Sequence, residues 1–119
     1  MAFRLKPSKT PTLRENDVET ACLHVLALRG YWVGRNHCGT FKSADNRRWI
    51  KGHPKGTPDY VCMKGPQGFL LEAKRPGAKT SPEQDQKHYE LRQFFRLTIV
   101  TVDCVEQLIA WLDEHERAG

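Results

Sequence analysis

Two acidic side chains and one amine are spaced so that they could form one reactive site. Glu72 and Lys74 lie two residues apart in a predicted strand over residues 69–74. Because side chains alternate across a strand, residues two apart point to the same face. Asp59 opens a second predicted strand, over residues 59–64, that pairs with the first as an antiparallel hairpin. In a suitable register, all three groups meet on one face of the sheet.

The register of this hairpin decides how close the two carboxylates come. Its turn, GPQG at residues 65–68, has proline suited to the second position and glycine at both ends. A turn centred on the middle of this segment sets Asp59 opposite Lys74 and diagonal to Glu72. A shift of the pairs by two sets Asp59 opposite Glu72 itself. Either register brings the carboxylates within about 5–8 Å on one face, whereas a slip by one residue separates them.

The chemistry of such a group follows from its charges. Two close carboxylates repel each other unless a cation lies between them. Hard oxygen ligands favour magnesium or manganese, and the backbone carbonyl of Ala73 is a natural third ligand beside Asp59 and Glu72. A divalent ion there activates water and offsets charge on a phosphate, while the Lys74 amine orients the water or stabilises the transition state. This combination is typical of phosphodiester hydrolysis.

The elements around the hairpin follow from hydrophobic spacing and from helix start and stop signals. Ser81, Pro82 and Gln84 form a strong helix start, with serine as N-cap and proline at the first helical position. A strand, a crossover helix and a further strand build a sheet covered by helices, so we predict an α/β fold with a mixed β-sheet flanked by helices, in the order αβββαβα. The remaining predictions are a helix over 13–29, a strand over 31–35, a loop over 36–57, a helix from 82 to about 95, a strand over 97–102 and a last helix beginning near 103.

Length predicts one globular domain, and the charge is compatible with a polyanionic partner. The 119 residues allow a single domain, predicted over 13–119 after a flexible basic arm at 1–12. No apolar run has the length of a membrane span or a signal peptide, so we expect a cytoplasmic protein. The net charge of +5 is uneven, with a basic surplus in the first 75 residues and an acidic surplus afterwards. Clustered cations are typical of nucleic-acid binding, although a solvated basic surface without a partner explains them equally well.

The four cysteines are widely spaced and form no CxxC pair. In an intracellular protein, this spacing predicts reduced thiols. His37, Cys38 and His53 could in principle hold zinc, but they lack the close paired spacing of structural zinc sites. We therefore favour free thiols at all four positions, which are Cys22, Cys38, Cys62 and Cys104.

Six short motifs follow one another along the chain: Glu15, Arg29-Gly30-Tyr31, Arg35-Asn36, Gly56-Thr57-Pro58-Asp59, Glu72-Ala73-Lys74-Arg75-Pro76 and Ser81-Pro82-Glu83-Gln84. The proline–aspartate and ExK pair resembles the signature of the PD-(D/E)xK nuclease superfamily. The full ordered set is similar to its VRR-Nuc (virus-type replication-repair nuclease) branch, in the small stand-alone form. The resemblance runs from about residue 15 to residue 102, nearly the whole predicted domain.

The resemblance implies a restriction-endonuclease-like core and a DNA endonuclease dependent on Mg²⁺ or Mn²⁺. It implies Asp59 and Glu72 as metal ligands, Lys74 as the catalytic lysine, and Glu15 and Gln84 as supporting catalytic residues, with Glu15 as a candidate further ligand. Small stand-alone members of the family are thought to act as homodimers on branched DNA such as four-way junctions, and for this chain we also consider flaps. The resemblance therefore also implies a homodimer, a branched DNA partner and a bacterial or phage-encoded protein acting in replication, recombination or repair.

Simpler explanations exist for several of these residues. The ExK could be a surface ion pair, and the same spacing in Asp85-Gln86-Lys87 falls on a predicted helix, where residues two apart do not face each other. Glu15 follows Thr12 by three residues, so a helix capping box explains it, and Glu19 one turn later could take its place at the site.

Gln84 is also open to two interpretations. It is the third residue of a capping box that begins at Ser81. However, it shares a predicted helix face with Leu91 and Phe95, so its side chain should look inward toward the sheet. A buried amide needs partners, and the site could supply them.

A further set of polar residues could bind phosphates near the site, although each alone is more often a solvated surface group. Trp49 and Tyr31 could stack on an unpaired base, but packing is the better prediction for both. The competing function is a non-catalytic DNA-binding or regulatory module on the same scaffold, and a sequence-specific nuclease is a third. The candidate nucleic-acid contacts are Arg35, Asn36, Lys42, Arg47, Arg48, Lys51, Lys55 and Arg75.

Overall fold

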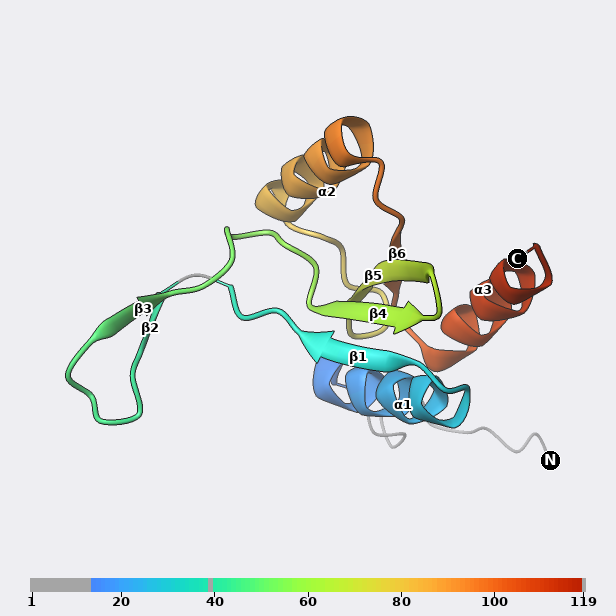
Figure 1. The fold of residues 1–119 in the computed structure, drawn as a ribbon, viewed down its shortest axis with the longest axis horizontal. Helices are drawn as coiled ribbons and strands as arrows, with labels where there is room; N and C mark the ends of the chain where they lie inside the picture. Colours follow the sequence, from blue (N-terminus) through green and yellow to red (C-terminus); the bar gives the residue numbers. More distant parts are fainter. Residues whose placement is uncertain (1–13, 39, 119) are drawn as a thin grey trace, which may run out of the picture.

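The computed structural model describes residues 14–38 and 40–118, and its elements are arranged around one main sheet (Figure 1). In chain order they are α1 (Glu15–Leu28), β1 (Trp32–Arg35), β2 (Thr40–Lys42), β3 (Trp49–Lys51), β4 (Tyr60–Lys64), β5 (Gln67–Ala73), α2 (Pro82–Phe95), β6 (Ile99–Val102) and α3 (Val105–Ala118).

The main sheet is mixed and has the strand order β1-β4-β5-β6. Strands β1, β4 and β5 are antiparallel neighbours, whereas β6 runs parallel to β5. The parallel pair requires a crossover, and α2 provides it. The predicted class, an α/β fold with a mixed sheet and flanking helices, is confirmed at this level.

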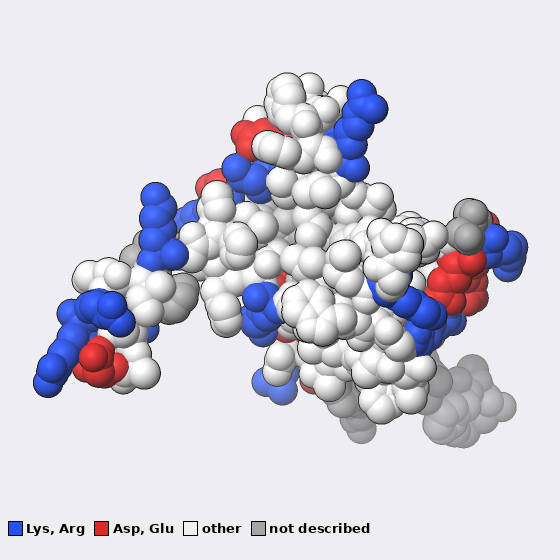
Figure 2. All heavy atoms as spheres, in the orientation of Figure 1, with Lys and Arg blue, Asp and Glu red and all other residues white. Residues whose placement is uncertain are grey.

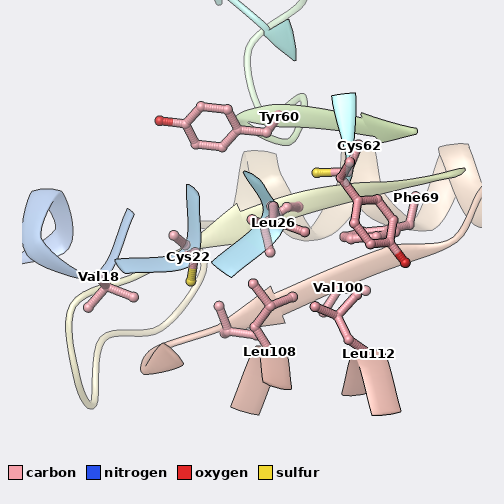
Figure 3. Packing of buried hydrophobic residues seen from close by; sticks show 13 residues of the cluster. Val18, Cys22, Leu26, Tyr60, Cys62, Phe69, Val100, Leu108 and Leu112 are labelled. Carbon is pink, nitrogen blue, oxygen red and sulfur yellow. The ribbon is translucent and has the colours of Figure 1, made fainter. Parts of the chain in front are cut away.

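The hydrophobic core lies between the sheet and the helices α1 and α3. Val18, Cys22 and Leu26 recur along one face of α1, and Leu108 and Leu112 along one face of α3. Figure 3 shows these side chains converging on residues of the sheet. All five are almost completely buried, and their spacing of three and four residues keeps them on one face of each helix.

The opposite face of the sheet is turned toward α2. Along β5, Leu71 and Ala73 enter the core, so the alternating Leu70 and Glu72 point to the other face. Figure 1 shows α2 on the other side of β4 and β5 from α1. His88 is the buried residue of α2. Phe95, which the sequence places on the inward face, is exposed at the end of α2, so that part of the prediction is wrong.

A second, two-stranded sheet lies in the segment predicted as a loop over 36–57, so that prediction is wrong for β2 and β3. The two strands pair antiparallel, and Ser43 N–H donates to the Arg48 carbonyl at 2.9 Å to close the turn. Asn46 adopts a positive φ of 64° in this turn, a conformation that asparagine tolerates. This hairpin, which we call the arm (residues 40–51), projects away from the main sheet (Figure 1). The described part of the chain therefore has two strands more than the predicted order.

The flexible basic N-terminal segment predicted over residues 1–12 lies outside the described residues, as does Leu13 of the predicted first helix. Among the residues that the structure does describe, no helix is long and apolar enough to cross a membrane. The four cysteines are free thiols, with Cys22 and Cys62 fully buried. Burial raises the pKa of Cys22 to about 11 and that of Cys62 to about 12.

Candidate functional site

The β4–β5 hairpin sets the two carboxylates opposite each other. Its turn consists of the two residues Gly65 and Pro66, because Lys64 pairs with Gln67. Gly65 adopts a positive φ of 62°, which suits a tight hairpin turn. The ladder pairs Tyr60 with Leu71, and one step further along the same register Asp59 faces Glu72. This is the second of the two predicted registers. The turn lies one residue earlier than its proline suggests, which moves every pair by two.

Glu72 is a buried carboxylate held by α2. Its side chain is about 1% exposed. The Gln84 side chain donates from Nε2 to Glu72 Oε1 at 3.2 Å, and His88 Nε2 lies 3.6 Å from the same oxygen. A carboxylate so far from water is costly unless polar partners surround it. The two α2 side chains therefore fix the position of Glu72 and offset part of its desolvation.

The electrostatics of the two carboxyls depend on their closeness. Burial, and then the contact with Glu72, raises the pKa of Asp59 to about 7, although Lys74 and Arg35 act in the opposite direction. Burial also raises the pKa of Glu72. In the absence of a cation, both carboxyls therefore keep their protons to higher pH than free carboxyls do, as expected for two acidic groups that share one site.

Lys74 completes the group at the end of β5. Its backbone N–H donates to the Val102 carbonyl at 2.8 Å, which ties the residue to the end of β6. Its side chain is about 15% exposed, and its Nζ lies 3.8 Å from Glu15 Oε1 on α1. The residues that the sequence groups as carboxylate, carboxylate and amine thus come together, with Glu15 beside the amine.

Glu15 and Glu19, which the sequence could not separate, have different surroundings. Helix α1 begins at Glu15, and the Arg14 N–H donates to the Asp17 carboxylate at 2.9 Å. Asp17 therefore fills the capping role considered for Glu15. Glu19 is buried and accepts a hydrogen bond from the Tyr60 hydroxyl at 3.0 Å.

Gln84 satisfies both of its predicted interpretations at once. Its backbone N–H donates to Ser81 Oγ at 3.2 Å, and its Oε1 accepts from the Ser81 N–H at 2.9 Å, which is a complete capping box. Its remaining donor, Nε2, is the one that reaches Glu72. The cap fixes the side-chain rotamer, so the start of α2 presents this amide to the site in one orientation.

His88 is a site residue that the sequence analysis missed. It is buried, and its Nε2 has no hydrogen-bond partner among the described residues. Burial lowers the pKa of His88, so its approach to Glu72 is a polar contact of a neutral ring and not an ion pair. A signal was present in the sequence, because position 88 follows Gln84 by four residues on the same helix face.

The basic residues lie on the side of Asp59 that faces the arm. Asn36 N–H donates to the Asp59 carbonyl at 2.7 Å, and its side chain donates to the Pro58 carbonyl at 2.9 Å. A shallow hollow beside these contacts is lined by Arg35, Asn36, His37, Cys38 and Asp59. Lys42, Arg47, Arg48 and Lys51 are exposed on the arm, and Lys55 and Arg75 are exposed in neighbouring loops.

A hard metal ion at this position would depend on oxygen ligands. Within residues 14–38 and 40–118, no three His, Cys, Asp or Glu side chains form a group that could hold a metal ion. His37, Cys38 and His53, which we considered as a zinc site, therefore do not form one. Asp59 and Glu72 offer two carboxylates, and Ala73 adds a backbone carbonyl next to Glu72 in the chain. Such a set suits Mg²⁺ or Mn²⁺, which take water molecules for the remaining positions.

Gly56 brings the segment before Asp59 against the start of α2. Its φ is +88°, and an added Cβ would lie 2.4 Å from the Glu83 carbonyl oxygen. We expect Gly56→Ala to destabilise the protein by about 2–4 kcal/mol through the backbone strain and the clash together. Gly77→Ala is the matched control, because Gly77 has a φ of +78° with no atom within 4 Å of the added Cβ. Equal losses in thermal unfolding for the two variants would contradict the close approach.

No protein-family model matches the chain, and a search of curated proteins found no match either.

Proposed function

We propose that the chain is a DNA endonuclease that hydrolyses phosphodiester bonds with Mg²⁺ or Mn²⁺, on a restriction-endonuclease-like core of the VRR-Nuc type. The observation that carries the proposal is the meeting of Asp59, Glu72 and Lys74 on one side of the β4–β5 hairpin, with the carboxylates directly opposed. A scaffold without activity has no need to hold a half-buried and a fully buried carboxyl against each other, because their repulsion destabilises the fold.

The residues present fit a divalent cation. Asp59 and Glu72 have raised pKa values in the absence of a cation. A positive charge between the two carboxylates would offset both the cost of burying them and their mutual repulsion. They would hold the ion together with the Ala73 carbonyl, with Glu15 as a candidate further ligand. The ion would supply Lewis acidity, which lowers the pKa of water and offsets charge on the phosphate.

The protein's own side chains would orient and stabilise the reacting groups. Lys74 lies at the edge of the site, where its ammonium would stabilise the charge that develops on a phosphate during hydrolysis. Glu15 would hold that ammonium in place from α1. Gln84 and His88 would keep Glu72 oriented from α2, so that its carboxylate does not reorganise during the reaction.

The charge distribution supports a nucleic-acid substrate. Lys and Arg side chains cover much of the projecting arm in Figure 2, and further cations flank the site through Arg35 and Arg75. Clustered cations bind a phosphate backbone and release its counterions, which favours DNA over a small substrate. A protein that acts on intracellular DNA belongs in the cytoplasm of a bacterial or phage-infected cell, and this location is part of the proposal.

The proposal includes a homodimer. Val61, Met63, Leu70 and Leu97 line an uncovered apolar hollow on the sheet face beside α2, and Phe95 is exposed nearby in the chain. A second copy of the chain would remove this apolar surface from water. Light scattering is then expected to give twice the chain mass of 13.7 kDa, and Leu97→Asp is expected to return the monomer. A monomer at micromolar concentration would remove the dimer from the proposal.

The two glutamates of α1 are expected to separate activity from stability. Glu15→Ala removes only a half-exposed partner of Lys74, so cleavage should slow by about tenfold with little change in melting temperature. Glu19→Ala leaves the buried Tyr60 hydroxyl without its acceptor, which should destabilise the fold by about 1–3 kcal/mol. Cleavage rates and thermal melts of both variants test this, and the reverse pattern would assign the site role to Glu19.

The direct test compares four labelled DNA substrates: a linear duplex, a four-way junction, a flap and a single strand. Each is incubated with Mg²⁺, with Mn²⁺ or with a chelator. The proposal expects cleavage only with a metal ion, and faster cleavage of the branched substrates. Binding of DNA without cleavage under every condition would instead support the non-catalytic DNA-binding module, and defined cut sites on the linear duplex would support a sequence-specific nuclease.

A further inference from the structure

The arm carries a largely exposed aromatic side chain. Trp49 is 67% exposed on β3, so it lies outside the core, and Ile50 beside it is also exposed. Strands β2 and β3 pair only with each other among the described strands. A two-stranded hairpin is marginally stable without a surface to pack on. An exposed tryptophan on such an element indicates a binding partner.

The chemistry of the arm indicates which partner it fits. Lys42 pairs with Trp49 across the hairpin, and its Nζ lies 4.6 Å from the centre of the indole ring. A flat ring and an ammonium side by side match a nucleotide, which offers a base to stack and a phosphate to pair. Asp45 is the only acidic residue among residues 36–58, against five cations. This excess of positive charge favours nucleic acid over a second copy of the same arm.

The base of the arm lies at the candidate site. Its first strand leads back to Asn36, which is bonded to Asp59, and His53 N–H donates to the His37 carbonyl at 2.7 Å where the two sides of the arm meet. The hollow next to Asp59 and a second hollow next to Lys51 are both lined by Arg35 and His37. A nucleic-acid strand that enters along the arm is therefore led toward the carboxylates.

We propose that Trp49 is a stacking site for an unpaired base, and that the arm selects DNA in which a single strand branches from a duplex. This inference rests on the proposed function and names its substrate class. The bases of an intact duplex are stacked on each other and offer no free face to an indole ring, whereas an unpaired base does. Lys42, Lys51 and the arginines of the arm contact phosphates in either case, so they supply affinity and Trp49 supplies the preference.

The test measures binding of two labelled DNAs in the presence of a chelator, so that no cleavage occurs. One DNA is a duplex with a single-stranded flap, and the other is the fully paired duplex of equal length. Trp49→Ala is expected to weaken flap binding by roughly 5- to 100-fold, the range for loss of one base stack, with less than about threefold loss on the paired duplex. Trp49→Phe should retain most of the flap affinity, because it keeps an aromatic face.

Trp32→Ala is the matched control, because Trp32 is 64% exposed on β1 of the main sheet. It should change neither affinity. Equal losses on the two DNAs for Trp49→Ala, or no loss on the flap, would overturn the inference. A change of molecular mass in light scattering for Trp49→Ala alone would also overturn it, because the tryptophan would then bind a second copy of the chain. Wild-type cleavage with Mg²⁺ is measured in parallel, so selective flap binding without any cleavage would refute the endonuclease and leave the stacking site standing.

Discussion

Lys74→Ala is expected to lower the rate of DNA cleavage by roughly a thousandfold while the fold and the affinity for DNA persist. The Lys74 ammonium lies 3.8 Å from Glu15 Oε1 and acts to lower the pKa of both Asp59 and Glu72 by its charge, so it is well placed to stabilise charge developing on a phosphate. Removal of one such electrostatic group from an active site costs about 10²–10³ in rate, and more where the group also orients water. The phosphate-binding residues of the arm are untouched, so binding in a chelator should remain within a few fold.

The chain contains its own control for this variant. Lys87 follows Asp85 by two residues, as Lys74 follows Glu72. However, Lys87 lies on α2, where it forms an ion pair with Glu90 at 2.8 Å. Lys87→Ala removes the same side chain from a surface helix and should leave the cleavage rate unchanged. Single-turnover rates on one flap substrate compare the two variants directly. Undiminished cleavage by a pure Lys74→Ala protein would refute the assignment of the catalytic lysine.

Asp59→Asn is expected to abolish cleavage and, at the same time, to stabilise the metal-free protein at neutral pH. The pKa of Asp59 is raised from 3.8 to about 7 in the folded state. A raised carboxyl pKa means that the folded state binds the proton more tightly than the unfolded state. Its contribution to stability is therefore fully present below about pH 4 and is lost as the pH rises to 7. Asparagine carries no charge at any of these pH values, so Asp59→Asn avoids this loss of stability as the pH rises.

The size of the stability effect follows from the shift. Each pKa unit corresponds to about 1.4 kcal/mol, and the coupling with Glu72 divides the effect between two groups, so a gain of roughly 1–3 kcal/mol at pH 8 is expected. Urea unfolding in a chelator at pH 5 and pH 8 measures it. The metal-free wild type should be less stable at pH 8 than at pH 5, and Asp59→Asn should reduce this difference.

Asp45→Asn is a control, because the pKa of Asp45 is shifted in the opposite direction from that of Asp59. Asp45 lies at the exposed turn of the arm, where hydrogen bonds from Ser43 and from the Arg47 N–H lower the pKa of its carboxyl. Its substitution removes a favourable charge, so it should give no gain in stability at pH 8. A metal-free Asp59→Asn protein that is no more stable than the wild type at pH 8 would contradict the close approach of the two carboxyls.

The sequence predicts best those features that depend on neighbouring residues. The start of α2 is set by Ser81, Pro82 and Gln84, whose capping groups act over three residues, and the structure shows this cap. The presence of α1 and α3 follows from hydrophobic spacing within each segment. The hairpin register was open between two alternatives, because both Gly65 and Pro66 can lead a tight turn, and the positive φ of Gly65 decides it.

Features that depend on distant parts of the chain were missed or left open. The strands of the arm have only three residues each, which is too short to show a period in the sequence, and so the sequence indicated a loop. Glu15 and Glu19 are one helical turn apart, and only the position of α1 relative to β4 and β5 shows that Glu15 lies beside Lys74. His88 became a site residue only once α2 was placed over Glu72.

The measurement that tests the account most directly is an anomalous-scattering map from a crystal of the protein soaked in Mn²⁺ near pH 7.5. The account predicts one strong peak between the side chains of Asp59 and Glu72, with both carboxylates as ligands, and its loss in an Asp59→Asn crystal. A map with no peak at this position, or a structure in which the two carboxylates point to opposite faces of the sheet, would contradict it.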